Sequence, residues 1–157
     1  EVHVLGELER VDDRTRRAVE TIIDGTRGGD ALRLNLMISY GGREEILRSA
    51  QILAAQVASG ELSVEDLDED AFRSTLFTAD VPDPDLLIRT SGEYRISNFM
   101  LWQLAYTEFY STEKFWPDFG KPMLLEAIDS YNNRERRFGR TSEQIQPPVA
   151  NVRQSAQ

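Results

Sequence analysis

The sequence predicts an α/β domain in which a mostly parallel sheet is flanked by helices. Two observations support this fold class. Short apolar segments alternate with amphipathic ones along residues 1–134, which is the order of strand and helix in parallel sheets. Residues 86–88 are continuously apolar, as in strands buried on both faces. With 157 residues and 40% hydrophobic composition, the chain can bury one core of ordinary size.

The first half of the chain contains two predicted strand–helix pairs. Residues 2–6 are β-branched and apolar and end at a glycine, so they form the first strand. Asp12 or Asp13 can cap the helix that follows, and Gly25 and Gly28-Gly29 are expected to end it. Residues 32–38 form the second strand. Residues 44–57 form an amphipathic helix ended by Gly60. Its predicted apolar face consists of Ile46, Ala50, Leu53, Ala54 and Val57.

The second half begins with an acidic helical stretch from Ser63. Its Leu67, Phe72 and Leu76 are expected to pack while its carboxylates face water. The segment 81–84, with two prolines, interrupts it. The remaining elements follow the same alternation: a strand at 85–88, a helix at 99–105, a short strand at 108–110 and a terminal helix at 124–138. We predict a domain over residues 1–141 and a flexible tail over 142–157, which is rich in Gln and Ser.

Composition restricts the classes of function. The chain has 27 acidic against 18 basic residues and a net charge of −9, which argues against a nucleic-acid partner. An anionic ligand must therefore meet a local cluster of arginines. The chain has no cysteine, so neither a disulfide nor a thiolate metal site can form. No stretch approaches the ~18 apolar residues of a membrane-spanning helix. We expect a soluble, cytoplasmic protein, and a chain that starts at Glu1 without Met or a signal sequence resembles a piece cut from a longer one.

Arg89 directly follows the predicted strand 85–88 and thus lies at a carboxyl end, where such folds bind ligands. Thr90, Ser91 and Gly92 allow a tight turn and offer N–H and hydroxyl donors, and Arg95 and Ser97 come just before the predicted helix 99–105. Two guanidinium groups beside a helix N-terminus suit phosphate or diphosphate. The alternative is an ordinary turn in which Arg89 and Arg95 pair with Asp85 or Glu93.

Glu108 stands in an otherwise apolar segment. A buried carboxylate without a partner is costly, so Mg²⁺ bridging to phosphate oxygens would suit it. An exposed glutamate on an edge strand is an equally good interpretation. The nearby aromatic residues Trp102, Tyr106, Phe109 and Trp116 are expected in the core or in an interface, because aromatic clusters usually pack.

Two further segments contain polar groups that could approach a ligand. Residues 40–43, Tyr-Gly-Gly-Arg, follow a strand and open a helix; a plain strand-to-helix turn is the simpler interpretation. Residues 134–140 carry four arginines. They suit bidentate phosphate binding, although cations at a helix C-terminus are also expected from the helix dipole alone.

The motifs together resemble the signature of cis-prenyltransferases, the undecaprenyl diphosphate synthase family. The central part of the resemblance consists of Arg89-Thr90-Ser91-Gly92-Glu93, Arg95-Ile96-Ser97-Asn98-Phe99, Leu101-Trp102-Gln103, Tyr106, Glu108 and Trp116-Pro117-Asp118-Phe119. Tyr-Gly-Gly-Arg at 40–43 and Arg-Glu-Arg-Arg-Phe-Gly at 134–139 match two further blocks in the same order. The resemblance spans nearly everything between residues 2 and 141.

The resemblance implies a Mg²⁺-dependent transferase that adds isopentenyl diphosphate to an allylic diphosphate primer such as farnesyl diphosphate. The product would be a cis-polyprenyl diphosphate of the undecaprenyl type, a cell-wall lipid carrier released at the membrane surface. By the same resemblance Arg89, Arg95 and Ser97 hold isopentenyl diphosphate, and Glu108 helps to place Mg²⁺. Arg137 and Gly139 reach the site of the partner subunit in a homodimer.

The departures from the family pattern limit this interpretation. Neither the Asp-Gly-Asn block, whose aspartate is the principal catalytic residue, nor the Ser-x-Glu-Asn block of the family occurs in this sequence. Ser39 replaces the usual Asn before Tyr-Gly-Gly. The chain therefore resembles the C-terminal portion of a synthase, an incomplete domain. The alternative is a non-catalytic partner subunit of a heteromeric cis-prenyltransferase.

Overall fold

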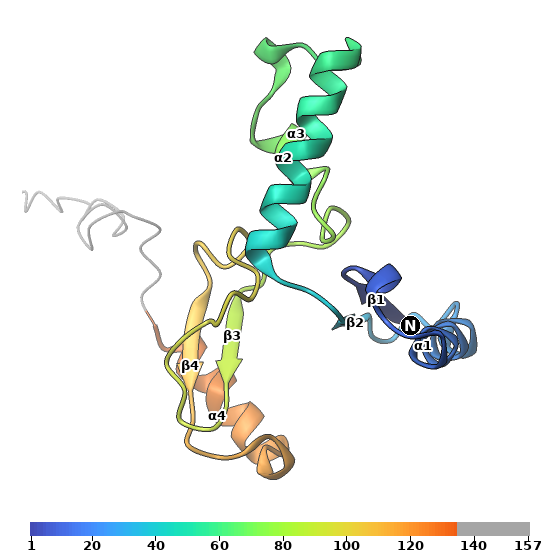
Figure 1. Cartoon of the computed structure of the whole chain (residues 1–157). Coiled ribbons are helices and arrows are strands. Elements are labelled where there is room, and N and C mark those ends of the chain that lie inside the picture. Colours follow the sequence, from blue (N-terminus) through green and yellow to red (C-terminus); the bar gives the residue numbers. More distant parts are fainter. Residues whose placement is uncertain (135–157) are drawn as a thin grey trace, which may run out of the picture. The chain divides into compact units, whose positions relative to one another are not determined.

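The computed structural model describes residues 1–134 (Figure 1). In this part of the chain, helices follow the first, second and fourth strands, whereas no helix lies between the third and the fourth. They fall into two compact units. Unit 1 comprises Glu1–Pro84 with Tyr94–Thr107, and unit 2 comprises Asp85–Glu93 with the chain from Glu108 onward. Each unit contains a two-stranded parallel sheet. The predicted α/β class is confirmed, and the predicted tail at 142–157 lies outside the described residues.

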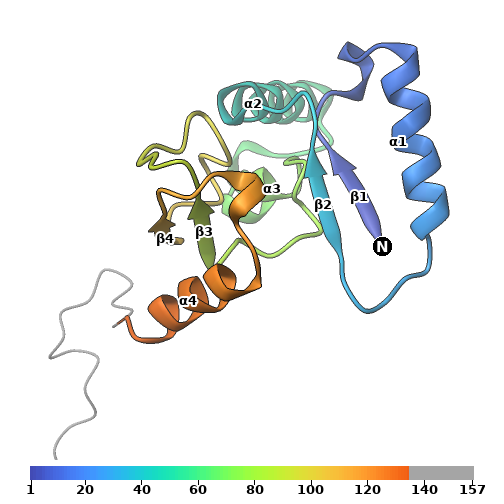
Figure 2. The same cartoon turned by 90° about the horizontal axis from the view of Figure 1, so that it is seen from below.

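In unit 1, strands β1 (Val2–Leu5) and β2 (Leu34–Met37) pair in parallel, with Val2 opposite Leu34. Helix α1 (Asp13–Thr26) connects them and packs against β1 (Figure 2). Asp12 caps this helix, because its Oδ1 accepts hydrogen bonds from the backbone N–H groups of Arg14 and Thr15 at 2.9 and 3.0 Å. The predicted cap is confirmed. The helix ends at Thr26, between the glycines at 25 and 28 that were expected to stop it, and Gly28 has a positive φ of 81°.

Helix α2 (Gly42–Ser59) follows β2 and ends where predicted, at Gly60, whose φ of 79° is the left-handed conformation that glycine adopts without strain. The predicted apolar face is only partly correct, because Ala50 and Ala54 are exposed. The inward face of α2 includes Leu53 and also the polar residues Glu45 and Ser49, whose side chains form hydrogen bonds within unit 1. Its buried members are Gly42, Glu45, Ser49 and Leu53.

The acidic stretch that follows forms two short helices rather than one long one. They are η2 (Val64–Asp66) and α3 (Glu69–Arg73). The label η1 belongs to a short helix earlier in the chain, Leu8–Arg10. Ser63 and Asp68 cap η2 and α3 with side-chain acceptors, which explains the break between the two. Leu76 is buried as predicted, whereas Leu67 is exposed. The carboxylates of this stretch face water, as expected.

In unit 2, strands β3 (Leu86–Arg89) and β4 (Glu108–Ser111) pair in parallel, and helix α4 (Lys121–Asn132) packs on β4 (Figure 1). The short η3 (Trp116–Asp118) leads into α4. Helix α4 begins three residues before the predicted start at 124, because Gly120 occupies the N-cap and Pro122 fits the first turn. Its last helical residue is Asn132, and the predicted end at 138 lies outside the described residues.

The predicted helix at 99–105 is wrong. This segment is a series of turns, and three residues at its start, Ser97, Asn98 and Met100, have positive φ values of 51°, 63° and 47°. The carbonyl of Asn98 accepts a hydrogen bond from Gly42 instead of starting a helix. Across residues 1–134, no helix is long and apolar enough to cross a membrane.

Candidate functional site

Arg89 ends strand β3 and lies beside Ser111 of β4. Its Nε atom is buried and has no hydrogen-bond partner among the described residues. The carboxylate of Asp85, one alternative partner from the sequence, instead accepts a hydrogen bond from the Tyr131 hydroxyl at 3.2 Å. A buried guanidinium nitrogen without an acceptor is unfavourable, so Arg89 is suited to receive an anion at the carboxyl end of the sheet.

The loop after Arg89 is held by its own backbone. The N–H of Ser91 donates to Lys114 O at 2.8 Å, and the N–H of Gly92 donates to Thr112 O at 2.9 Å. Both loop residues have a φ of 67°. The prediction that these amides are available to a ligand is therefore wrong, because the turn uses them to attach itself to the segment after β4.

Arg95 and Ser97 belong to unit 1, whereas Arg89 belongs to unit 2, so each is described within its own unit. No helix begins directly after Ser97. The helix N-terminus beside this loop is that of α2, because Gly42 N–H donates to Asn98 O at 2.7 Å and Arg43 N–H donates to Asn98 Oδ1 at 2.9 Å. Unit 1 thus brings the Tyr-Gly-Gly-Arg segment and the Arg95–Ser97 loop together, although they are distant in the sequence.

Close packing requires a glycine at position 42 of this segment. A Cβ atom on Gly42 would lie 2.8 Å from Leu101 Cγ and 3.1 Å from the carbonyl oxygen of Asn98. A Cβ on Gly41 would meet only the flexible ends of the Glu44 and Asn98 side chains, which can move. The simpler interpretation of Gly-Gly, a plain strand-to-helix turn, is therefore incomplete, because Gly42 also admits the 98–101 turn against the start of α2.

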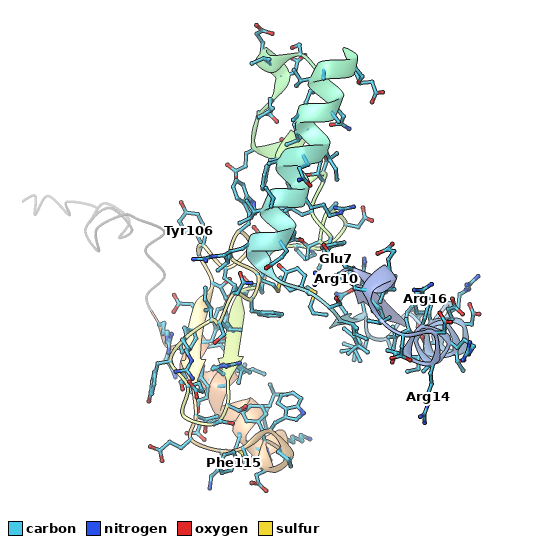
Figure 3. All side chains as sticks on the ribbon, viewed as in Figure 1. Glu7, Arg10, Arg14, Arg16, Tyr106 and Phe115 are labelled. Atoms are coloured by element: carbon cyan, nitrogen blue, oxygen red, sulfur yellow. The ribbon has the colours of Figure 1, made fainter. Side chains whose placement is uncertain are left out.

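A polar cavity of about 280 Å³ opens at the carboxyl ends of β1 and β2. Glu7 and Arg10, which form an ion pair at 2.8 Å, stand together at its edge (Figure 3). Other residues that line it are Ser39, Tyr40, Glu44 and Asn98. The Asn98 amide donates to the Glu44 carboxylate at 3.0 Å and holds the pKa of Glu44 below its usual value. In a parallel sheet this edge is the usual place for a ligand.

A buried polar network lies next to this cavity, and the sequence analysis missed it. The carboxylate of Glu45, only 1% exposed, accepts hydrogen bonds from the Tyr40 hydroxyl at 2.7 Å, the Phe77 N–H at 2.9 Å and the Gln103 amide at 3.0 Å. Gln103 also donates to Thr78 Oγ1 at 2.8 Å. Burial, followed by the hydrogen bond to Glu45, raises the pKa of Tyr40. The sequence did contain one signal for this network: a glutamate, Glu45, on the inward face of a helix, about one turn after Gly42.

Glu108 lies at the opposite end of its sheet from Arg89. It opens β4 beside Leu86, and three residues of strand, about 10 Å, separate the two ends. Its Oε2 accepts from Arg134 Nη1 at 2.8 Å, and the same nitrogen donates to Phe109 O at 2.9 Å. The structure thus gives Glu108 a cationic partner that neither interpretation of the sequence had anticipated.

The magnesium ion implied by the resemblance needs several oxygen ligands. Within residues 1–134, no group of three or more His, Cys, Asp or Glu side chains is arranged to hold a metal ion. Glu108 offers one carboxylate, and Arg134 already pairs with it. The described residues therefore do not form a magnesium site by themselves, and the role of Glu108 toward Mg²⁺ stays a prediction.

The aromatic residues differ in how far they pack. Trp102 lies 4.4 Å from the Phe72 ring, between centroids, as expected of a core aromatic. Tyr106 is 79% exposed and points outward (Figure 3), and Trp116 is 73% exposed, although its ring stacks on Phe119 at 6.3 Å. These two side chains therefore do not pack in the core of their unit, and the alternative position in an interface stays a prediction. Phe109 is partly buried. The predicted site residues Arg137 and Gly139 lie outside the described residues.

Fold and site together define an α/β protein whose anion-binding candidates follow the strands of parallel sheets. The comparisons with known proteins give the family. The family described as "Putative undecaprenyl diphosphate synthase" matches residues 1–139, and the chain belongs to this family. The resemblance seen in the sequence is thereby confirmed.

Curated relatives agree with this assignment. The chain is 52% identical over 143 residues to an isoprenyl transferase of Geobacter sulfurreducens, covering 91% of this chain and 58% of that protein. It is 47% identical over 150 residues to a ditrans,polycis-undecaprenyl-diphosphate synthase of Vibrio cholerae, described as specific for (2E,6E)-farnesyl diphosphate, covering 96% and 60%. The chain therefore spans somewhat more than half the length of these relatives.

Solved structures show the same fold. A crystal structure of lavandulyl diphosphate synthase from Lavandula x intermedia, in complex with dimethylallyl diphosphate, matches with a TM-score of 0.84 and 40% identity, covering 88% of this chain and 60% of that one. A probable undecaprenyl diphosphate synthase from Campylobacter jejuni matches with a TM-score of 0.74 and 35% identity, covering 89% and 63%.

Proposed function

We propose that the complete protein containing this chain is a cis-prenyltransferase. It condenses isopentenyl diphosphate with an allylic diphosphate primer, such as farnesyl diphosphate, and makes a cis-polyprenyl diphosphate of the undecaprenyl type. The observation that carries this proposal is the family match over residues 1–139. The relatives that are 47–52% identical are named as transferases or synthases, so a non-catalytic partner subunit is not favoured.

The geometry of Arg89 supports the proposal. A diphosphate places several negative charges in a small volume, and a guanidinium fork matches phosphate oxygens with two parallel hydrogen bonds. Arg89 has a buried Nε without a partner at the carboxyl end of β3. In the proposed reaction Arg89, Arg95 and Ser97 bind the diphosphate of isopentenyl diphosphate and orient its double bond toward the primer. Correct orientation of two substrates supplies a large share of the rate enhancement in a bimolecular reaction.

Magnesium dependence is part of the proposal for the complete protein. A divalent cation would offset the charge that develops as the allylic C–O bond ionises. Because the described residues do not complete a metal site, its other ligands must come from elsewhere. Glu108 is proposed as one contact, which requires that it share or leave its ion pair with Arg134.

We also propose that the complete protein forms a homodimer, in which Arg137 and Gly139 serve the partner's site, and that it meets the membrane surface to release its product. Support for both comes from the family resemblance. Sedimentation analysis of the complete protein tests the first, and co-sedimentation with vesicles tests the second.

The proposed activity is tested by incorporation of labelled isopentenyl diphosphate by the complete protein, with farnesyl diphosphate as primer. We expect Arg95→Ala and Glu108→Ala each to lower incorporation at least tenfold, about 1.4 kcal/mol or more. Removal of divalent cations with EDTA should abolish incorporation, and added Mg²⁺ should restore it.

Arg27→Ala serves as a matched control, because Arg27 pairs with the exposed Asp24 and contacts neither segment assigned to substrate. This variant should retain normal turnover. Normal incorporation by both Arg95→Ala and Glu108→Ala would refute the site assignment, and a wild-type protein that incorporates no isopentenyl diphosphate would refute the activity itself.

A further inference from the structure

Asn98 joins the Arg95–Ser97 loop to the start of helix α2 through three hydrogen bonds. Its carbonyl oxygen accepts from Gly42 N–H at 2.7 Å, its Oδ1 accepts from Arg43 N–H at 2.9 Å, and its Nδ2 donates to Glu44 Oε2 at 3.0 Å. Both segments belong to unit 1. One residue thus meets the backbone and the side chain of the first helical turn.

Helix α2 needs this contact because its own N-cap lacks a side chain. Gly41 occupies the N-cap position and makes no side-chain capping bond. The first N–H groups of a helix have no partner within the helix, and a side-chain oxygen of the cap residue normally accepts from one of them. Asn98 Oδ1 does so from 55 positions away in the sequence.

The backbone of the loop is adapted to the same contact. Asn98 has a φ of 63° and the preceding Ser97 a φ of 51°, a region in which asparagine is tolerated better than most residues. The close approach of Leu101 and the Asn98 carbonyl to Gly42 leaves no room for a side chain at that glycine. The turn at 97–98 and the glycine at 42 therefore fit each other.

We propose that Asn98 is a positioning residue that holds Ser97 and Arg95 in their substrate-binding geometry by fastening the loop to α2. This inference rests on the proposed assignment of Arg95 and Ser97 to isopentenyl diphosphate. In this proposal Asn98 acts through the loop that it fastens and not through a contact with isopentenyl diphosphate. Its removal weakens binding of isopentenyl diphosphate, because the loop must then be ordered at the expense of binding energy.

The test uses steady-state kinetics of the complete protein at saturating farnesyl diphosphate. In Asn98→Asp the new carboxylate can still accept from Arg43 N–H, but it faces the Glu44 carboxylate instead of donating to it. We expect the KM for isopentenyl diphosphate to rise about tenfold, as for the loss of a helix cap and a like-charge contact, with kcat changed less than threefold.

The decisive arm is the double variant Asn98→Asp with Glu44→Gln. The introduced glutamine amide donates to the introduced carboxylate, so donor and acceptor exchange places and the contact is restored. KM should return to within about twofold of the wild-type value. Glu44→Gln alone should be nearly silent, since its amide oxygen still accepts from Asn98. Thermal melting of all variants checks that they fold.

An unchanged KM in Asn98→Asp, or a raised KM that Glu44→Gln does not restore, overturns the inference while the proposed function stands. Asn98→Ala and Asn98→Gly add a second measurement. Both lose the side-chain bonds, but glycine keeps the positive φ without strain. A raised KM in both supports the side-chain contact, whereas a raised KM in Asn98→Ala alone would show that only the backbone conformation matters and would overturn it. A wild-type protein without isopentenyl transfer refutes the proposed function as well.

Discussion

Glu45 in unit 1 and Arg89 in unit 2 are charged side chains with buried polar atoms, and the two differ in whether these atoms have partners. Three donors from three different segments surround the Glu45 carboxylate. The buried Nε of Arg89 has none among the described residues. A buried carboxylate with three donors helps to specify a conformation, whereas a buried polar atom without a partner calls for an explanation such as a ligand. Within residues 1–134, Gln103 Oε1 and Arg16 Nε are also buried without a partner, so the position of Arg89 at the carboxyl end of β3 is what points to an anion. The difference distinguishes Glu45, which maintains the fold, from Arg89, which is suited to bind an anion.

The largest expected effect comes from removing Arg89. Arg89→Ala should lower incorporation of isopentenyl diphosphate by two to three orders of magnitude, about 3–4 kcal/mol, because a preorganised charged donor is lost. Its thermal midpoint should stay the same or rise, since the variant no longer buries a guanidinium nitrogen that lacks a hydrogen-bond partner. Arg89→Lys keeps the charge without the fork and should recover only part of the activity. A large loss of stability with normal turnover would show that Arg89, like Glu45, maintains the fold, and would contradict the difference proposed between the two residues.

Removing Glu45 should give the opposite result. Glu45→Ala leaves the Tyr40 hydroxyl and the Phe77 N–H without their acceptor, and the Gln103 amide keeps only Thr78 Oγ1, so the free energy of unfolding should fall by about 2 kcal/mol. Urea denaturation of the complete protein measures this value. The exposed Glu20 of α1 provides the matched control, and Glu20→Ala should leave the denaturation midpoint almost unchanged. Equal midpoints for the two variants would contradict the structural role of Glu45.

The smallest effect is a change in pH dependence at Tyr40. The folded state raises the pKa of Tyr40 above its ordinary value of 10.0, mainly through burial. Above about pH 10 the unfolded chain releases this proton and the native state retains it. The contribution of Tyr40 to stability is therefore complete below pH 10 and declines as the pH rises through the raised pKa. Tyr40→Phe should flatten the fall of the unfolding free energy between pH 9 and 11. Identical slopes would show that Tyr40 is not shielded.

Local signals in the sequence predicted most elements of the fold. The four strands of residues 1–134 agree with the prediction to within about two residues, because short apolar runs bounded by polar residues or glycine determine them. Asp12 and Gly60 identified one end each of α1 and α2. The prediction of a helix at 99–105 was wrong because a long-range contact determines the conformation at its start. The Asn98 carbonyl accepts a hydrogen bond from Gly42, a residue distant in the sequence.

The candidate site shows the same limit. Arg89 was placed correctly at the end of a strand because its position follows from the strand itself. The Glu45 network was missed since Gln103 lies 58 positions away, and periodicity along one helix carries no information about such a partner. The pairing of Glu108 with Arg134 is likewise long-range, at 26 positions. Contacts of this kind arise from tertiary packing, which one sequence does not display.

The fastening of the loop by Asn98 has a consequence for how opening of the site can be observed. Amide protons in the first turn of a helix usually exchange quickly with solvent, because nothing in the helix binds them. Here the amides of Gly42 and Arg43 are both bound by Asn98. Their hydrogen exchange therefore reports release of the 94–107 loop, although the probes lie on α2. Two protons on a stable helix thus record the motion of a segment that they do not belong to.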